Sequence, residues 1–63
     1  MAFNYFEVKY NTAMAEIMLG NLAKASRFLK EISKVAEEQN EIELKNSMDL
    51  LINLLSKETL KKF

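Results

Sequence analysis

The chain has 63 residues, nine basic and nine acidic side chains, and therefore a formal net charge of zero. It has no Cys, no His and no Pro, which excludes thiolate and imidazole metal sites and any catalytic triad that uses His. The balanced charge gives no general attraction toward nucleic acid, and a single Gly cannot form a glycine-rich phosphate loop. We therefore expect a protein that is not an enzyme and that has no cofactor and no metal site.

No segment of the sequence has the character of a membrane span or of an export signal. Charged residues such as Glu16, Arg27 and Asp49 interrupt every apolar stretch before it reaches membrane-spanning length. The first residues lack a basic segment followed by an apolar one, and the absence of cysteine suits a reducing compartment. We expect a cytoplasmic protein without a membrane partner.

The first predicted helix covers about residues 5–38, a segment rich in the good helix formers Leu, Ala, Met, Glu and Lys. Asn4 and Glu7 have the spacing of a capping box, in which Asn4 caps the helix and Glu7 bonds back to the capping residue. This pattern places the start of the helix at Tyr5.

Gly20 is the one interruption of this segment, since Gly inside a helix costs ~1 kcal/mol relative to Ala. The seven-residue apolar repeat nevertheless stays in phase from Ala15 to Leu22. We therefore expect a continuous helix through Gly20. The alternative is a break there, which would give three helices.

The second predicted helix covers about residues 41–61, after a tight turn at about residues 39–40. Asn40 and Glu43 repeat the capping-box spacing directly after a polar run, with Asn40 as the predicted N-cap. The predicted fold is all-α: residues 1–63 form one antiparallel helical hairpin.

Both helices carry apolar residues at intervals of three and four, the spacing of coiled-coil-like helix packing at a shallow angle. The residues predicted to form the core are Leu22, Leu29, Ile32, Leu44, Met48, Leu51 and Leu55.

The small size of the chain predicts self-association. Burial of apolar surface would stabilise one folded chain by ~90 kcal/mol, and the lost conformational entropy would cost ~95 kcal/mol. Small chains usually add disulfides, a metal or an oligomer, and the composition excludes the first two. A second helix of about 31 Å would also leave part of a first helix of about 50 Å uncovered. The uncovered part, residues 3–17, is rich in aromatic and apolar side chains. We expect two hairpins to form a four-helix bundle, with dimer or partner contacts at Phe3, Phe6, Tyr10, Met14 and Ile17.

This shape predicts a homodimeric adaptor or scaffold that binds an unidentified protein partner. The alternative is a nucleic-acid-binding regulator that uses the basic residues Lys24, Arg27 and Lys30. Local i,i+4 pairs such as Arg27–Glu31 favour an ordinary solvated face over phosphate contact.

Three resemblances carry these expectations further. The length and the start Met-Ala-Phe-Asn-Tyr-Phe resemble the small helical-hairpin protein of Sulfolobus spindle-shaped viruses. That resemblance implies a homodimeric antiparallel four-helix bundle without enzymatic activity, a viral protein in the cytoplasm of an archaeal host.

The heptad stripes and the polar turn at residues 39–40 are similar to ROP-type RNA-binding bundles. The spacing of small and apolar residues from Gly20 to Ile32 resembles half of a tetratricopeptide repeat, which implies a three-helix interaction module.

Overall fold

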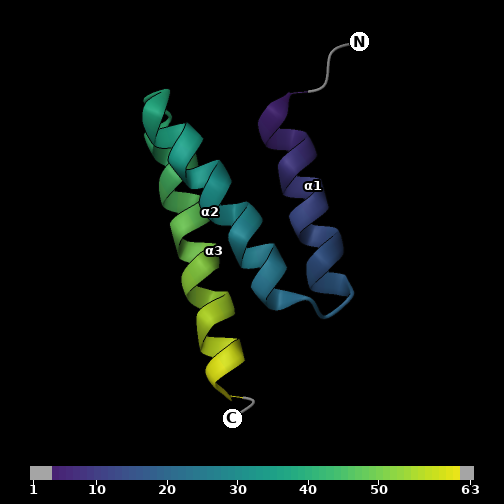
Figure 1. Ribbon diagram of the computed structural model, residues 1–63. Coiled ribbons are helices and arrows are strands. Elements are labelled where there is room, and N and C mark those ends of the chain that lie inside the picture. The colour runs from purple at the N-terminus through teal and green to yellow at the C-terminus, as the bar shows by residue number, and fades with distance from the viewer. Residues whose placement is uncertain (1–3, 62–63) are drawn as a thin grey trace.

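The computed structural model describes residues 4–61, and side chains as far as residue 57. This part of the chain forms three helices and no strand: α1 (Tyr5–Met18), α2 (Leu22–Glu38) and α3 (Ile42–Lys61). The chain runs down α1, back up α2 and down α3, so that α2 lies between the other two (Figure 1). The predicted all-α class is confirmed. The predicted continuous helix over residues 5–38 is wrong, because the chain reverses at Gly20.

The reversal at Gly20 is a Schellman turn. The amide of Asn21 donates to the carbonyl of Glu16 at 2.8 Å, and the amide of Gly20 donates to the carbonyl of Ile17 at 3.0 Å. These two bonds satisfy carbonyls that the end of a helix leaves without partners. Gly20 has φ +84°, a left-handed conformation that glycine adopts without a Cβ clash. The apolar repeat therefore continues in the sequence while the helix does not.

The turn between α2 and α3 has the same construction. The amide of Glu41 donates to the carbonyl of Ala36 at 2.8 Å, and the amide of Asn40 donates to the carbonyl of Glu37 at 3.2 Å. Asn40 has φ 64° and occupies the left-handed position that Gly20 occupies in the first turn. The prediction that Asn40 is an N-cap is therefore wrong. Asn suits both positions, because its short polar side chain tolerates the left-handed region.

The start of α1 agrees with half of the predicted capping box. The side chain of Asn4 accepts a hydrogen bond from the amide of Phe6 at 2.8 Å, so Asn4 is the N-cap. Glu7 makes no hydrogen bond back to Asn4 among the described residues. Glu7 instead lines the groove between α1 and α3 that is described below.

The core lies where α2 contacts both of its neighbours. Its fully buried side chains come chiefly from α2, at the intervals of three and four that keep one face of a helix together. Three of the buried residues are alanines, which allow close approach of the helices. The buried core residues are Ala13, Ala25, Leu29, Ile32, Ala36 and Met48. Of the other residues predicted for the core, Leu44, Leu51 and Leu55 pack against this cluster half-buried, and Leu22 is half-buried at the start of α2.

The predicted overhang of residues 3–17 does not form. Because the chain turns back at Gly20, α1 packs along α2 and buries Ala13 against it. Within the described residues no Cα of α1 lies within 8 Å of one in α3. The two outer helices therefore flank a space that α2 closes on one side only.

Candidate protein-interaction surfaces

An apolar groove runs between α1 and α3, with Ile32 of α2 among its lining residues. The groove encloses about 530 Å³ and is open to solvent along one side. Its walls are almost wholly apolar, and Glu7 is the one charged residue that lines it within the described part of the chain. The lining residues are Phe6, Glu7, Tyr10, Ile32, Leu44, Ser47, Met48, Leu50 and Leu51.

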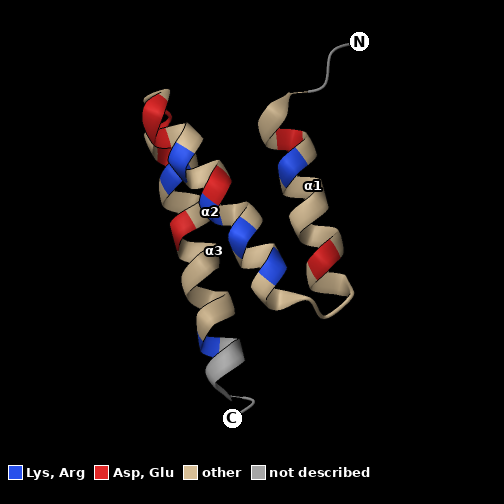
Figure 2. Ribbon diagram, viewed as in Figure 1, with Lys and Arg blue, Asp and Glu red and all other residues tan. Residues whose placement is uncertain are grey.

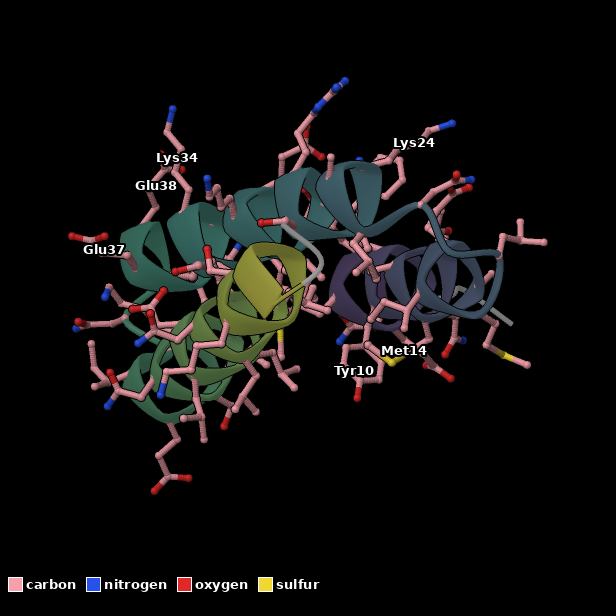
Figure 3. The ribbon with its side chains drawn as sticks, turned by 90° about the horizontal axis from the view of Figure 1, so that it is seen from below. Tyr10, Met14, Lys24, Lys34, Glu37 and Glu38 are labelled. Atoms are coloured by element: carbon pink, nitrogen blue, oxygen red, sulfur yellow. The ribbon has the colours of Figure 1, made fainter. Side chains whose placement is uncertain are left out.

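The residues predicted as dimer or partner contacts lie in several places. Phe6 and Tyr10 line the groove, with Phe6 half-buried and Tyr10 exposed. Figure 3 shows Tyr10 and Met14 projecting from α1 on the side of the molecule opposite the outer face of α2. Met14 and Ile17 are half-buried. Phe3 lies outside the described residues.

The outer face of α1 carries a second apolar stripe. Tyr5, Val8 and Leu19 are 44%, 47% and 72% exposed, and Thr12 and Ala15 between them are exposed as well. These five residues recur at intervals of four and three, so they form one line along the helix. We call this line the α1 stripe. A shallow depression along it is lined by Val8, Asn11, Thr12, Ala15 and Glu16.

None of the five residues of the α1 stripe is charged, and Glu16, which lies beside them in the same depression, is bonded to other residues. Lys9 bonds to Glu31 of α2, Glu16 accepts a hydrogen bond from Asn21, and Glu7 lines the groove. The hydroxyl of Thr12 donates to the carbonyl of Val8 at 2.9 Å, so that this donor is already paired within its own helix. The Thr12 hydroxyl at the centre of the α1 stripe can therefore be buried without losing its hydrogen bond.

Lys9 joins α1 to α2. Its ammonium lies 2.6 Å from a carboxylate oxygen of Glu31 and 4.7 Å from the centre of the Phe28 ring. The hydrogen bond to Glu31 raises the pKa of Lys9, against the opposing effect of desolvation. The predicted local pair of Arg27 with Glu31 is absent from the described structure, because the reversal at Gly20 brings Lys9 within reach of Glu31.

A second polar contact joins α2 to α3. The hydroxyl of Ser33 donates to Asp49 at 2.7 Å, and the ammonium of Lys45 donates to the other oxygen of Asp49 at 2.8 Å. These two donors hold the pKa of Asp49 below its ordinary value, with Lys45 the larger cause. The contact is specific to the pairing of these two helices, because Ser33 and Asp49 lie 16 residues apart.

The contact of Asp49 with Ser33 and Lys45 predicts that the stability of the fold depends on pH. A carboxylate whose pKa is lower in the folded chain stabilises it above the pKa of the unfolded chain, which is about 3.9 for Asp. This stabilisation is lost as the pH falls through the lowered folded value. Asp49→Asn removes it, so the difference in unfolding free energy between wild type and Asp49→Asn should shrink as the pH falls from about 6 to about 2. Urea unfolding at each pH measures that difference.

Ser33→Ala is the matched variant for this experiment. It removes one donor to Asp49 and leaves Lys45 in place, so it should retain part of the pH-dependent difference. A constant gap between wild type and Asp49→Asn over the whole range would contradict a lowered pKa at Asp49.

The basic residues considered for nucleic acid lie on the outer face of α2. Lys24, Arg27 and Lys30 are exposed, and Lys24 and Lys34 point away from α1 and α3 (Figure 3). Lys24 lies 4.0 Å from Glu16, and Figure 2 shows acidic residues close to the basic ones on the ribbon. Contact of this face with nucleic acid remains a prediction.

Within the described residues, no group of three or more acidic side chains is placed to hold a metal ion. No described helix is long and apolar enough to cross a membrane.

Two residues that line the groove were not predicted from local sequence patterns. Glu7 has the spacing of a capping residue but lies in the groove, and exposed Leu50 is spaced off the core line of α3. An apolar residue off the core line, such as Leu50, is the signal that could have pointed to this wall of the groove.

The chain was compared with protein-family models, with curated proteins and with solved structures, and none of them matches it.

Proposed function

We propose that this protein is a non-enzymatic homodimeric adaptor, in which two copies associate through the α1 stripe and each presents its groove to a partner protein. The observation that carries this proposal is the second apolar face of α1. Helices with two apolar faces are typically covered on both faces. In the single chain α2 covers only one face of α1, so the other face is available to a second copy.

The α1 stripe is complementary to itself in the antiparallel direction. With a two-fold axis beside Thr12, Val8 of one copy lies opposite Ala15 of the other, and a larger side chain meets a smaller one. The five residues of the stripe carry no charge, and the carboxylate of Glu16 beside them already accepts a hydrogen bond from Asn21 and lies 4.0 Å from the ammonium of Lys24. In this arrangement α1 and α2 of each copy supply the four helices of the bundle, and α3 lies outside it.

The dimer would act as an adaptor because it carries two copies of the groove. Each copy retains its own groove between α1 and α3, on a different side of α1 from the stripe. Two equivalent sites in one particle can bridge two partner molecules, or bind a divalent partner with increased avidity. The resemblance to the spindle-shaped-virus protein would place this adaptor in an archaeal host cell, and that setting remains a prediction.

Light scattering after size exclusion tests the dimer. Wild type should have about twice the 7.3 kDa mass of one chain at micromolar concentrations. Thr12→Glu should have the mass of a single chain, because it places two carboxylates beside the two-fold axis in an apolar contact. Its helical circular dichroism should stay unchanged, because Thr12 is exposed in the single chain.

Thr12→Ala is the matched control, because it keeps a small uncharged residue at the same position and should remain dimeric. Wild type with the mass of one chain at all concentrations would overturn the proposal. A Thr12→Glu variant that stays fully dimeric would show that the copies associate through another face.

A further inference from the structure

We infer that the groove between α1 and α3 binds a two-turn amphipathic helix of a different protein, one that carries a Lys or Arg at the end lying beside Glu7. This inference rests on the proposed function, because it names the class of partner that the groove takes, although binding in the groove requires only a single copy of the chain.

The size and shape of the groove fit one helix face. Along α3 its wall extends from Leu44 to Leu51, which is about 10 Å at the helical rise per residue. Three side chains at i, i+4 and i+7 of a bound helix cover that length. The volume of about 530 Å³ lies in the range of sites that bury several large side chains.

The lining of the groove favours a helix over an extended peptide. Its walls are helices, whose backbone amides and carbonyls already bond within the same helix, so the groove offers no free sheet edge. An extended peptide would therefore bury its own backbone groups without partners, which is costly. A helical ligand satisfies those groups internally and presents only side chains. The apolar residues Phe6, Ile32 and Met48 can then receive them.

Glu7 sets the orientation of the ligand. Among the described residues, Glu7 is the one charged residue that lines the groove, and it makes no hydrogen bond and no ion pair there. The turn between α2 and α3 lies at the same end of the molecule as the start of α1 (Figure 2), and it is flanked by Glu37, Glu38, Glu41 and Glu43. A basic side chain at that end of the ligand would pair with Glu7. Because Glu7 is exposed, the pair should contribute orientation and specificity more than affinity.

Leu50 supplies the outer edge of the groove. It lines the groove and is 60% exposed, so that in the single chain much of this side chain faces water. A bound helix would cover it and remove its apolar surface from solvent. Leu50 is therefore the residue whose change should affect binding most and folding least.

The test starts from a phage-displayed library of 12-residue peptides selected on the full chain. Enriched peptides should share large apolar residues at i, i+4 and i+7 and a Lys or Arg within one turn of a single end. The affinity of one synthetic selected peptide is then measured by fluorescence anisotropy. Leu50→Asp should weaken its binding more than tenfold. Asn53→Asp, an exposed position of α3 that does not line the groove, is the control and should leave binding unchanged.

A charge swap tests the orientation. Glu7→Lys should weaken the selected peptide about two- to fivefold, and a peptide with Glu in place of its basic residue should recover that loss on the Glu7→Lys protein. Ser47→Glu lies on the α3 wall of the groove, opposite Glu7. It is a second variant that should weaken peptide binding, and it leaves Leu50 unchanged.

Three results would overturn the inference: no shared helical spacing among the selected peptides, equal binding by wild type and Leu50→Asp, or a charge preference that Glu7→Lys leaves unchanged. A Leu50→Asp protein that loses its dimeric mass would show that a second copy fills the groove. Failure of the dimer is separately visible, because Thr12→Glu changes the mass of the particle and leaves the groove intact.

Discussion

Leu29→Ala is expected to lower the free energy of unfolding by about 2–5 kcal/mol, the largest effect of any single change considered for this chain. Leu29 is fully buried at the centre of α2, where the core cluster includes Ala13 of α1 and Met48 of α3. Removing its side chain loses the transfer free energy of three carbon atoms. It also leaves a cavity in a contact that both outer helices share.

Urea unfolding followed by circular dichroism at 222 nm measures this loss. Small domains have low stability, so Leu29→Ala could unfold the protein, and Leu29→Met serves as a milder variant. Because Met has nearly the volume of Leu, this change should lower the free energy of unfolding by less than about 1.5 kcal/mol. Leu54→Ala is the matched control, because Leu54 is half exposed on α3 and its truncation should cost far less. Equal losses at Leu29 and Leu54 would contradict the observed core.

Gly20→Ala is expected to lower the free energy of unfolding by about 1–2 kcal/mol. Nothing lies within 4 Å of the position that the added Cβ would take, so the cost comes from the backbone at φ +84° and from no clash with other residues. In a domain of this size a loss of 1 kcal/mol corresponds to a fall in Tm of about 4–8 °C. Thermal unfolding followed by circular dichroism measures the change.

Asn40→Gly is the matched variant, because Asn40 holds the equivalent left-handed position in the second turn with φ 64°. Glycine there relieves the same strain, so Asn40→Gly should keep or raise the Tm. A Gly20→Ala protein with higher helical content and higher Tm would contradict the reversal at Gly20. It would mean that residues 5–38 prefer one continuous helix.

The difference between the predicted and the observed course of α1 arises from two local signals of similar strength. A Gly inside a helix costs ~1 kcal/mol, which a continuous apolar stripe can offset. The stripe from Ala15 to Leu22 is in phase, and so locally the helix could continue. Turning back at Gly20 buries Ala13 and packs Phe6 against the core, a gain that depends on residues far away in the sequence.

The polar contacts show the same limit of local reasoning. The i,i+4 spacing of Arg27 and Glu31 predicts a pair on the surface of one helix, whereas Glu31 binds Lys9, 22 residues away. Lys45 and Asp49 do form an i,i+4 pair within α3, and Ser33 joins it only because α2 lies alongside. Both of these contacts therefore depend on the reversals at the two turns.

Helix propensity, capping and apolar periodicity are local properties. For that reason the all-α class, the N-cap at Asn4 and the heptad line of α2 with Leu29 and Ile32 can be predicted from the residues alone. Phe6 and Tyr10, which the sequence predicts as dimer or partner contacts, line the groove, and their contact with a partner stays a prediction. Three features follow only from how the helices pack: Gly20 ends a helix, Glu7 lines the groove, and the outer face of α1 is exposed in the single chain. These features depend on which faces α2 buries, and that choice balances burial over the whole chain against small local costs at two turns.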